Sequence, residues 1–182
     1  MKRHFIFLLI VLNCNLGTIA SNINIDTLFV NNVVSIENYL NLVIDGYILP
    51  SGNIDNPIAA SIDGRPVKTN YTDSTKFYIY GEYADFLNMF EDISNYKWER
   101  NSYVPNIMIN RQEILMVKDW YETNRKRLNC EKVKRLFQWY NSLTPNIHLL
   151  NKESLDKYHQ EKELIKRLDT FIDYESSTCV DQ

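Results

Sequence analysis

The segment DTLFVNNVVSIENYLNLVIDGY, residues 26–47, decides the fold because it is the clearest amphipathic pattern in the chain. Its apolar residues recur at alternating spacings of four and three, which places them on one stripe of an α-helix. We expect Asp26 to cap this helix and Pro50 to end it. The predicted buried stripe consists of Phe29, Val33, Ile36, Leu40, Val43 and Tyr47.

The helical period returns in four later segments, residues 82–94, 111–128, 131–142 and 151–174. Asn110 and Glu113 have the spacing of a capping box before the second of these, and Asn151 is the expected cap of the last. Only Lys76–Tyr80 has strand character. We therefore predict a mainly α fold, with about five amphipathic helices in one compact domain and room for one short strand pair.

Two long connections separate the predicted helices, at residues 50–74 and 95–109. The first contains the turn pair Asp63-Gly64 and several glycine and proline residues, and its residues 58–62 fit either one short helical turn or a short strand. A connection of this length inside a compact domain is often a binding element. Asn70-Tyr71-Thr72 within it matches the acceptor pattern for N-glycosylation.

Residues 1–20 have the pattern of a secretory signal peptide. Lys2 and Arg3 supply positive charge, residues 5–12 are an unbroken apolar run, and Thr18-Ile19-Ala20 offers small residues to a signal peptidase. The apolar run is far shorter than the roughly twenty residues of a membrane-spanning helix. We therefore expect cleavage near Ser21, a single domain over residues 21–182, and a periplasmic or secreted location without a permanent membrane anchor.

The charge balance bears on the partner. Removal of residues 1–20 leaves 18 basic and 23 acidic side chains, a balance of −5, which argues against nucleic acid as a partner. We interpret the basic residues near position 130 as the solvated side of two amphipathic helices, with phosphate or lipid head-group binding as the alternative. These residues are Arg125, Lys126, Arg127, Lys132, Lys134 and Arg135.

Three cysteines occur, and Cys14 belongs to the predicted signal peptide. In an oxidising compartment, Cys130 and Cys179 most simply form one disulfide. The bond would close a loop of about fifty residues and stabilise the fold by up to about 4 kcal/mol. The alternative is two separate thiols.

No strong catalytic or metal-binding motif is present in the sequence. His159 and Glu163 lie one helical turn apart, but two ligands do not make a metal site. His148 has no nucleophile linked to it by a motif. We therefore expect no catalytic residue, no metal and no cofactor, and we favour a protein that is not an enzyme.

Two alternatives stay open at this level. The first is a secreted hydrolase in which His148 or His159 converges with carboxylates or with Cys130. The second is a secreted effector or surface protein of a eukaryote or a virus, which an occupied glycan at Asn70 would support.

Aromatic residues in or next to the connections are the best binding candidates. Tyrosine and tryptophan are the residues that most often anchor protein interfaces. The partner-binding candidates are Tyr78, Tyr80, Trp98 and Tyr103.

The stretch VPNIMINRQEILMVKDWY, residues 104–121, resembles the second half of periplasmic immunity proteins, which neutralise peptidoglycan amidase effectors delivered by type VI secretion. Residues 128–143 are similar in outline to the last helix of that family, and Gly46-Tyr47-Ile48 is similar to its Gly-Tyr-Ile segment. The resemblance implies a helical inhibitor that binds another protein, such as a secreted toxin or enzyme, and occludes its active site. It carries over no functional residue of the family. Residues 50–74 and 98–103 are the expected contact surface.

Overall fold

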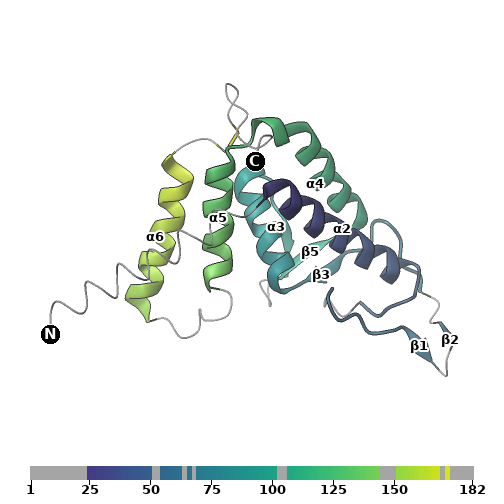
Figure 1. Ribbon diagram of the computed structural model, residues 1–182. Helices are drawn as coiled ribbons and strands as arrows, with labels where there is room; N and C mark the ends of the chain where they lie inside the picture. Colours follow the sequence, from purple (N-terminus) through teal and green to yellow (C-terminus); the bar gives the residue numbers. More distant parts are fainter. Residues whose placement is uncertain are drawn as a thin grey trace.

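The structure, a computed structural model, describes residues 24–50, 54–62, 65–66, 69–101, 106–143, 151–168 and 171–172. Five α-helices dominate these residues (Figure 1). They are α2 (Ile25–Ile44), α3 (Gly81–Ser94), α4 (Arg111–Asn124), α5 (Cys130–Leu143) and α6 (Lys152–Leu168), with the short 3₁₀ helix η1 (Arg125–Arg127) between α4 and α5. The prediction of a mainly α fold with about five helices is confirmed.

A small antiparallel sheet accompanies the helices. Its strands are β3 (Phe77–Ile79), β5 (Ile107–Ile109) and β4 (Glu99–Arg100), in that spatial order. The strand predicted at 76–80 is present, and Phe77 pairs with Ile109 in register. The predicted connection at 95–109 contains the other two strands. These two strands were not predicted, because β4 consists of two exposed charged residues and β5 is only three residues long, too short to show a clear alternation.

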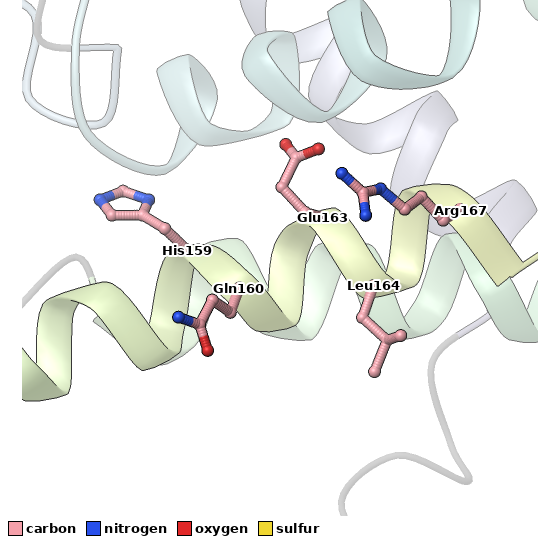
Figure 2. A pocket seen from close by; sticks show the side chains of 5 residues that line it. All are labelled: His159, Gln160, Glu163, Leu164 and Arg167. Atoms are coloured by element: carbon pink, nitrogen blue, oxygen red, sulfur yellow. The ribbon is translucent and has the colours of Figure 1, made fainter.

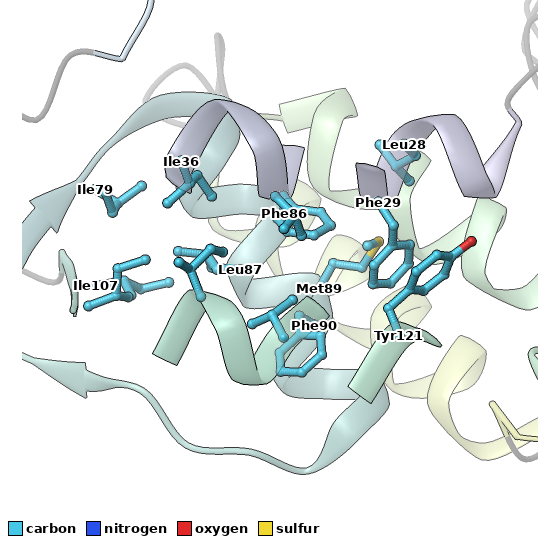
Figure 3. Close-up of a cluster of buried hydrophobic side chains, with 14 of the residues drawn as sticks. Leu28, Phe29, Ile36, Ile79, Phe86, Leu87, Met89, Phe90, Ile107 and Tyr121 are labelled. Carbon is cyan, nitrogen blue, oxygen red and sulfur yellow. The ribbon is translucent and has the colours of Figure 1, made fainter. Parts of the chain in front are cut away.

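The hydrophobic core lies where α2 crosses α3 and α4, with the buried side of the sheet at one end (Figure 3). Phe29 of α2 stacks on Tyr121 of α4, with ring centroids 4.2 Å apart, and meets the edge of Phe86 of α3 at 5.3 Å. Five of the six residues of the predicted α2 stripe are buried. The exception is Tyr47, which is 62% exposed, because α2 ends at Ile44 and the helical phase does not continue beyond it.

Side-chain caps fix where the helices begin. Asn24 caps α2, since its Oδ1 accepts from the amide of Thr27 at 3.0 Å. The prediction that Asp26 is the cap is therefore wrong; Asp26 instead accepts a hydrogen bond from the Tyr121 hydroxyl. The capping box of Asn110 and Glu113 is confirmed, with both of its hydrogen bonds at 2.9 Å.

Two predicted helices end earlier than expected. α4 stops at Asn124, because the chain tightens into η1 and then extends at Leu128. Leu128 is fully buried and forms an antiparallel bridge with Ile172. α6 ends at Leu168, whereas the sequence predicted an end near residue 174. Ile172 is no longer helical, because it forms the bridge with Leu128. The Asn151 cap of α6 is confirmed, at 2.9 Å from the Ser154 amide.

A buried carboxylate fastens α6 to the body. Asp92 of α3, with a side chain only 8% exposed, accepts hydrogen bonds from Lys162 at 2.7 Å and from Lys166 at 2.9 Å. The Tyr140 hydroxyl of α5 donates to the same carboxylate at 2.5 Å. We call Asp92, Tyr140, Lys162 and Lys166 the Asp92 cluster. It joins three helices through one acidic group.

The Asp92 cluster predicts a response to acid. Burial alone would raise the pKa of Asp92, but hydrogen bonds from Lys162, Tyr140 and Lys166 outweigh it and hold the pKa below its ordinary value. The stability that this carboxylate contributes is therefore complete at neutral pH and is lost as the pH falls through the lowered pKa, below about 4. We expect the amides of α6 to lose hydrogen-exchange protection in this range before those of α4. Loss of protection in both helices together would contradict the prediction.

Candidate protein-binding surface

The chain leaves the end of α2 through a glycine turn. Gly46 has φ 77°, in the left-handed region that favours glycine. Its amide bonds to the carbonyl of Val43 at 3.1 Å, and the amide of Tyr47 bonds to the carbonyl of Leu42 at 2.9 Å. This pair of bonds is a Schellman motif, and it satisfies carbonyls that the helix end leaves open. The motif fixes the direction in which the following residues depart.

The departing chain folds back on itself as an arm. We use "the arm" for the described residues 47–50, 54–62 and 65–66. Ile48 bridges Ala59, with flanking hydrogen bonds from Leu49 to Ile58 at 2.8 Å and from Ala60 to Tyr47 at 2.9 Å. Beyond this ladder, β1 (Ser61–Ile62) pairs with β2 (Arg65–Pro66). In Figure 1 this ribbon projects away from the helices.

The pairing of β1 with β2 shows where the chain of the arm reverses direction. Ile62 pairs with Arg65, so two residues connect β1 and β2. These are Asp63-Gly64, the pair predicted from the sequence to form a turn, which lie outside the described residues. The segment 50–74 therefore contains β1, within the residues 58–62 for which a short strand was one of two predictions, and β2, which was not predicted.

Several contacts anchor the root of the arm. Ile48 and Ala60 are buried, and Ile54 packs against the core. The Tyr83 hydroxyl of α3 donates to Asp55 at 2.7 Å, and the Thr69 hydroxyl donates to the carbonyl of Ile44 at 3.0 Å. Burial first, and the Asp55 carboxylate second, raise the pKa of Tyr83, so this hydroxyl keeps its proton. The arm thus leaves and rejoins the body at the same end of α2.

Three large apolar side chains of the arm face solvent. Tyr47 is 62% exposed, Leu49 is 40% exposed and Ile58 is 55% exposed. Leu49 and Ile58 are opposite each other across the ladder. Tyr47 falls on the side of its strand that Leu49 occupies, because side chains alternate and Ile48 between them is buried. We call Tyr47, Leu49 and Ile58 the arm patch.

The arm patch has charges of both signs nearby in the chain. Asp45 lies two residues before Tyr47 and Asp55 three residues before Ile58, and Arg65 of β2 also belongs to the arm. An apolar patch with a charged rim is typical of a protein interface.

The four aromatic residues predicted from the sequence to bind a partner differ in their exposure to solvent. Tyr78 and Tyr80 lie near each other on the outer side of β3, with ring centroids 6.2 Å apart. Tyr80 is exposed, whereas Tyr78 is half-buried and its hydroxyl accepts from the Asn101 amide at 2.6 Å. Tyr103 lies outside the described residues.

Trp98 differs from the other candidates because it belongs to the core. Its side chain is 5% exposed, its ring contacts Phe90 and Tyr96, and its Nε1 donates to the carbonyl of Leu87 at 2.7 Å. It therefore offers almost no surface to a partner. The local sequence did not reveal this, because the acceptor lies eleven residues earlier, on α3.

The arm patch was not predicted from the sequence. Tyr47 completes the apolar spacing of α2 so well that the pattern predicts it to be buried. The signal against that prediction is Gly46, since glycine next to the end of a helical pattern is typical of a Schellman cap. If the helix is taken to end before Gly46, Tyr47 and Leu49 fall two residues apart in an extended segment, and their side chains then lie on the same side of it.

The groups considered for a hydrolase do not come together in the described residues. Cys130 is buried at the start of α5, whereas His159 lies beside Trp139, near the other end of α5, with ring centroids 6.5 Å apart. Nine residues of helix separate positions 130 and 139 by about 13 Å along the axis. His148 lies outside the described residues.

His159 does line a shallow pocket on α6, together with Gln160, Glu163, Leu164 and Arg167. Figure 2 shows His159, Glu163 and Arg167 on one side of the helix and Leu164 on the other. All five side chains are exposed. The described residues contain no group of three or more histidine, cysteine or acidic side chains that would hold a metal ion.

Within the described residues, no helix combines the length and the apolar character needed to cross a membrane. Comparison of the chain with protein-family models, with characterised proteins and with solved structures finds no match.

Proposed function

We propose that this protein is an exported protein-binding module that contacts its partner through the arm patch. The supporting observation is that Tyr47, Leu49 and Ile58 are exposed together on an arm whose root is fixed by Ile48 in the hydrophobic core. Exposed apolar residues on a preorganised element are suited to binding, because little conformational entropy is lost when the partner docks. The protein acts by contact and carries out no reaction.

The more specific form of the proposal is inhibition. A projecting arm with an apolar patch fits a concave partner site. Together with the resemblance to periplasmic immunity proteins, this supports a protein that occludes the active site of a toxin acting on the cell envelope. Export rests on residues 1–20, which lie outside the described residues.

The expected disulfide is part of the same proposal. Cys179 lies outside the described residues, but the backbone at Ile172 is bridged to Leu128, two residues before Cys130. The seven steps from Ile172 to Cys179 span at most about 25 Å, enough to bring Cys179 back to Cys130. We expect peptide mapping without reductant to recover the two cysteines joined. The Cys179→Ser variant should lose up to about 4 kcal/mol of unfolding free energy. Recovery of two free thiols from oxidised protein would contradict the pairing.

Substitutions in the arm patch test the function. Tyr47→Ser and Ile58→Ser should each reduce partner recovery from an envelope or medium extract of the source cells. An anchor residue of an interface contributes about 2 kcal/mol or more, which corresponds to a loss of affinity of roughly thirtyfold. Stability should change little, because both side chains are exposed.

The matched control is Leu164→Ser, which removes an equally exposed apolar side chain from α6. It should leave partner recovery unchanged. Equal loss of recovery in all three variants, or in none, would count against the arm patch as the contact surface.

A further inference from the structure

The strand that returns along the arm, residues 58–62, has one unpaired edge. It pairs with residues 47–49 through its first part and with β2 through its last part. The carbonyl of Ile58 and the amide of Ala60 bond to residues 49 and 47, so the backbone groups of both point toward that neighbour. Those of Ile62 point the same way, because the direction of the backbone groups alternates along a strand.

The second neighbour, β2, lies on this same side. Pro66 has no N–H to donate, so the two residues of the β1–β2 ribbon that exchange hydrogen bonds are Ile62 and Arg65. The backbone groups of Ala59 and Ser61 therefore point to the opposite edge. No strand of the residues that the structure describes pairs with that edge.

This open edge lacks the features that usually keep an edge strand from pairing. Residues 58–62 read IAASI and contain no charged side chain, and both Ile58 and Ala59 are exposed. The neighbouring strand β2, by contrast, consists of an arginine and a proline, which are residues that protect an edge. The open edge begins after Pro57 and is about 17 Å long. It belongs to the ribbon that projects from the helices in Figure 1.

The open edge is complementary to itself. When two copies pair antiparallel about Ala60, Ala59 of each copy falls opposite Ser61 of the other. Both residues direct their backbone groups to the open edge, so each of the two pairs exchanges an N–H···O=C bond in both directions. Ile58 takes the position opposite Ile62 of the second copy, and no like charges meet along the edge.

We propose that two copies of the protein associate through this edge, with the two-fold axis at Ala60. The axis is perpendicular to the shared sheet, so the arm patches of both copies lie on one face of it. The edge is short compared with a standard interface of roughly 800 Å² per partner, so the dimer is weak and reversible. The association needs no other protein, and it is therefore tested separately from the function proposed for the arm patch.

Sedimentation equilibrium of the purified exported protein, from about 10 μM to about 1 mM, measures the association. We expect the mean mass to rise from that of one chain toward that of two. Ala59→Pro should stay monomeric, because it removes an N–H that points to the open edge and leaves the hydrogen bonds within the arm intact. The matched control Ala59→Val keeps this N–H and should associate like the wild type.

A charged variant separates loss of pairing from loss of folding. Ala59→Lys places two like charges close to the two-fold axis and should weaken the association at low salt. The association should return in 1 M salt, where the screening length falls to about 3 Å. A variant with a misfolded arm would not recover in this way.

Two single-cysteine variants test the register. Residues at the axis form a pair without mutual hydrogen bonds, with Cα atoms about 4.5 Å apart, which suits a disulfide. Ala60→Cys should therefore give a disulfide-linked dimer on mild oxidation. Ala59→Cys is more exposed, but its two copies lie diagonally, about 7–8 Å apart, and it should give little.

Three results would overturn the proposal. The first is a mean mass that stays at one chain over the whole concentration range. The second is association that Ala59→Pro leaves unchanged, since the open edge would then not be the contact. The third is faster cross-linking of Ala59→Cys than of Ala60→Cys, which is the order expected from random collision of exposed thiols.

Discussion

We expect Asp92→Ala to lower the free energy of unfolding by about 2–4 kcal/mol, because it leaves two lysines and a tyrosine without their shared acceptor. The lower end of this range reflects Lys162 and Lys166, whose side chains are 21% and 35% exposed and regain part of their hydration. Tyr140 is affected more, since its hydroxyl is directed at the carboxylate at 2.5 Å. Urea unfolding of the variant and the wild type measures the difference.

The location of the loss is as informative as its size. Hydrogen exchange should show that Asp92→Ala loosens α6 more than α4, because the carboxylate is the point where α6 meets α3. The control Asp156→Ala removes an exposed carboxylate of α6 and should change the unfolding free energy by less than about 0.5 kcal/mol. A similar small change for Asp92→Ala would contradict the role assigned to the cluster.

The second large effect is expected for Phe29→Ala, at about 3–5 kcal/mol. Phe29 is fully buried between α3 and α4, where it stacks on Tyr121 and meets the edge of Phe86. Truncation leaves a cavity at the meeting point of three helices. A loss of this size is a large part of the total stability of an ordinary domain, which is about 5–15 kcal/mol.

Val34→Ala is the control for Phe29→Ala, because it shortens an exposed side chain on the same helix. Its effect should be within about 0.5 kcal/mol of zero, since alanine also has the higher helix propensity. Comparable destabilisation by both variants would mean that the buried face of α2 is misassigned.

The helices were predictable because their information is local. The stripe of α2 repeats over five turns, and the capping box of Asn110 and Glu113 is complete within four residues. The sheet was not predictable in the same way. β4 is Glu99-Arg100, whose two charged residues carry no alternation, and it is a strand only because β5 is beside it.

The Asp92 cluster and the arm patch could not be predicted from local sequence patterns either. Asp92 is 48 residues from Tyr140 and 74 from Lys166, so no spacing rule connects them. In the arm, one residue decides the outcome: the turn at Gly46 ends the helical phase and moves Tyr47 from the predicted core to the surface. The turn predicted at Asp63-Gly64 lies outside the described residues, and the strands on either side of it pair with each other.

Site-specific photocross-linking identifies the residues of the protein that touch the partner, and so shows whether Tyr47 of the arm patch is one of them. A photoreactive phenylalanine analogue at position 47, with Leu164 replaced in a parallel sample, is irradiated in source cells that carry the tagged protein. We expect one discrete adduct with another protein from position 47 and none from position 164. Adducts from position 164 alone, or the same adducts from both positions, would contradict it.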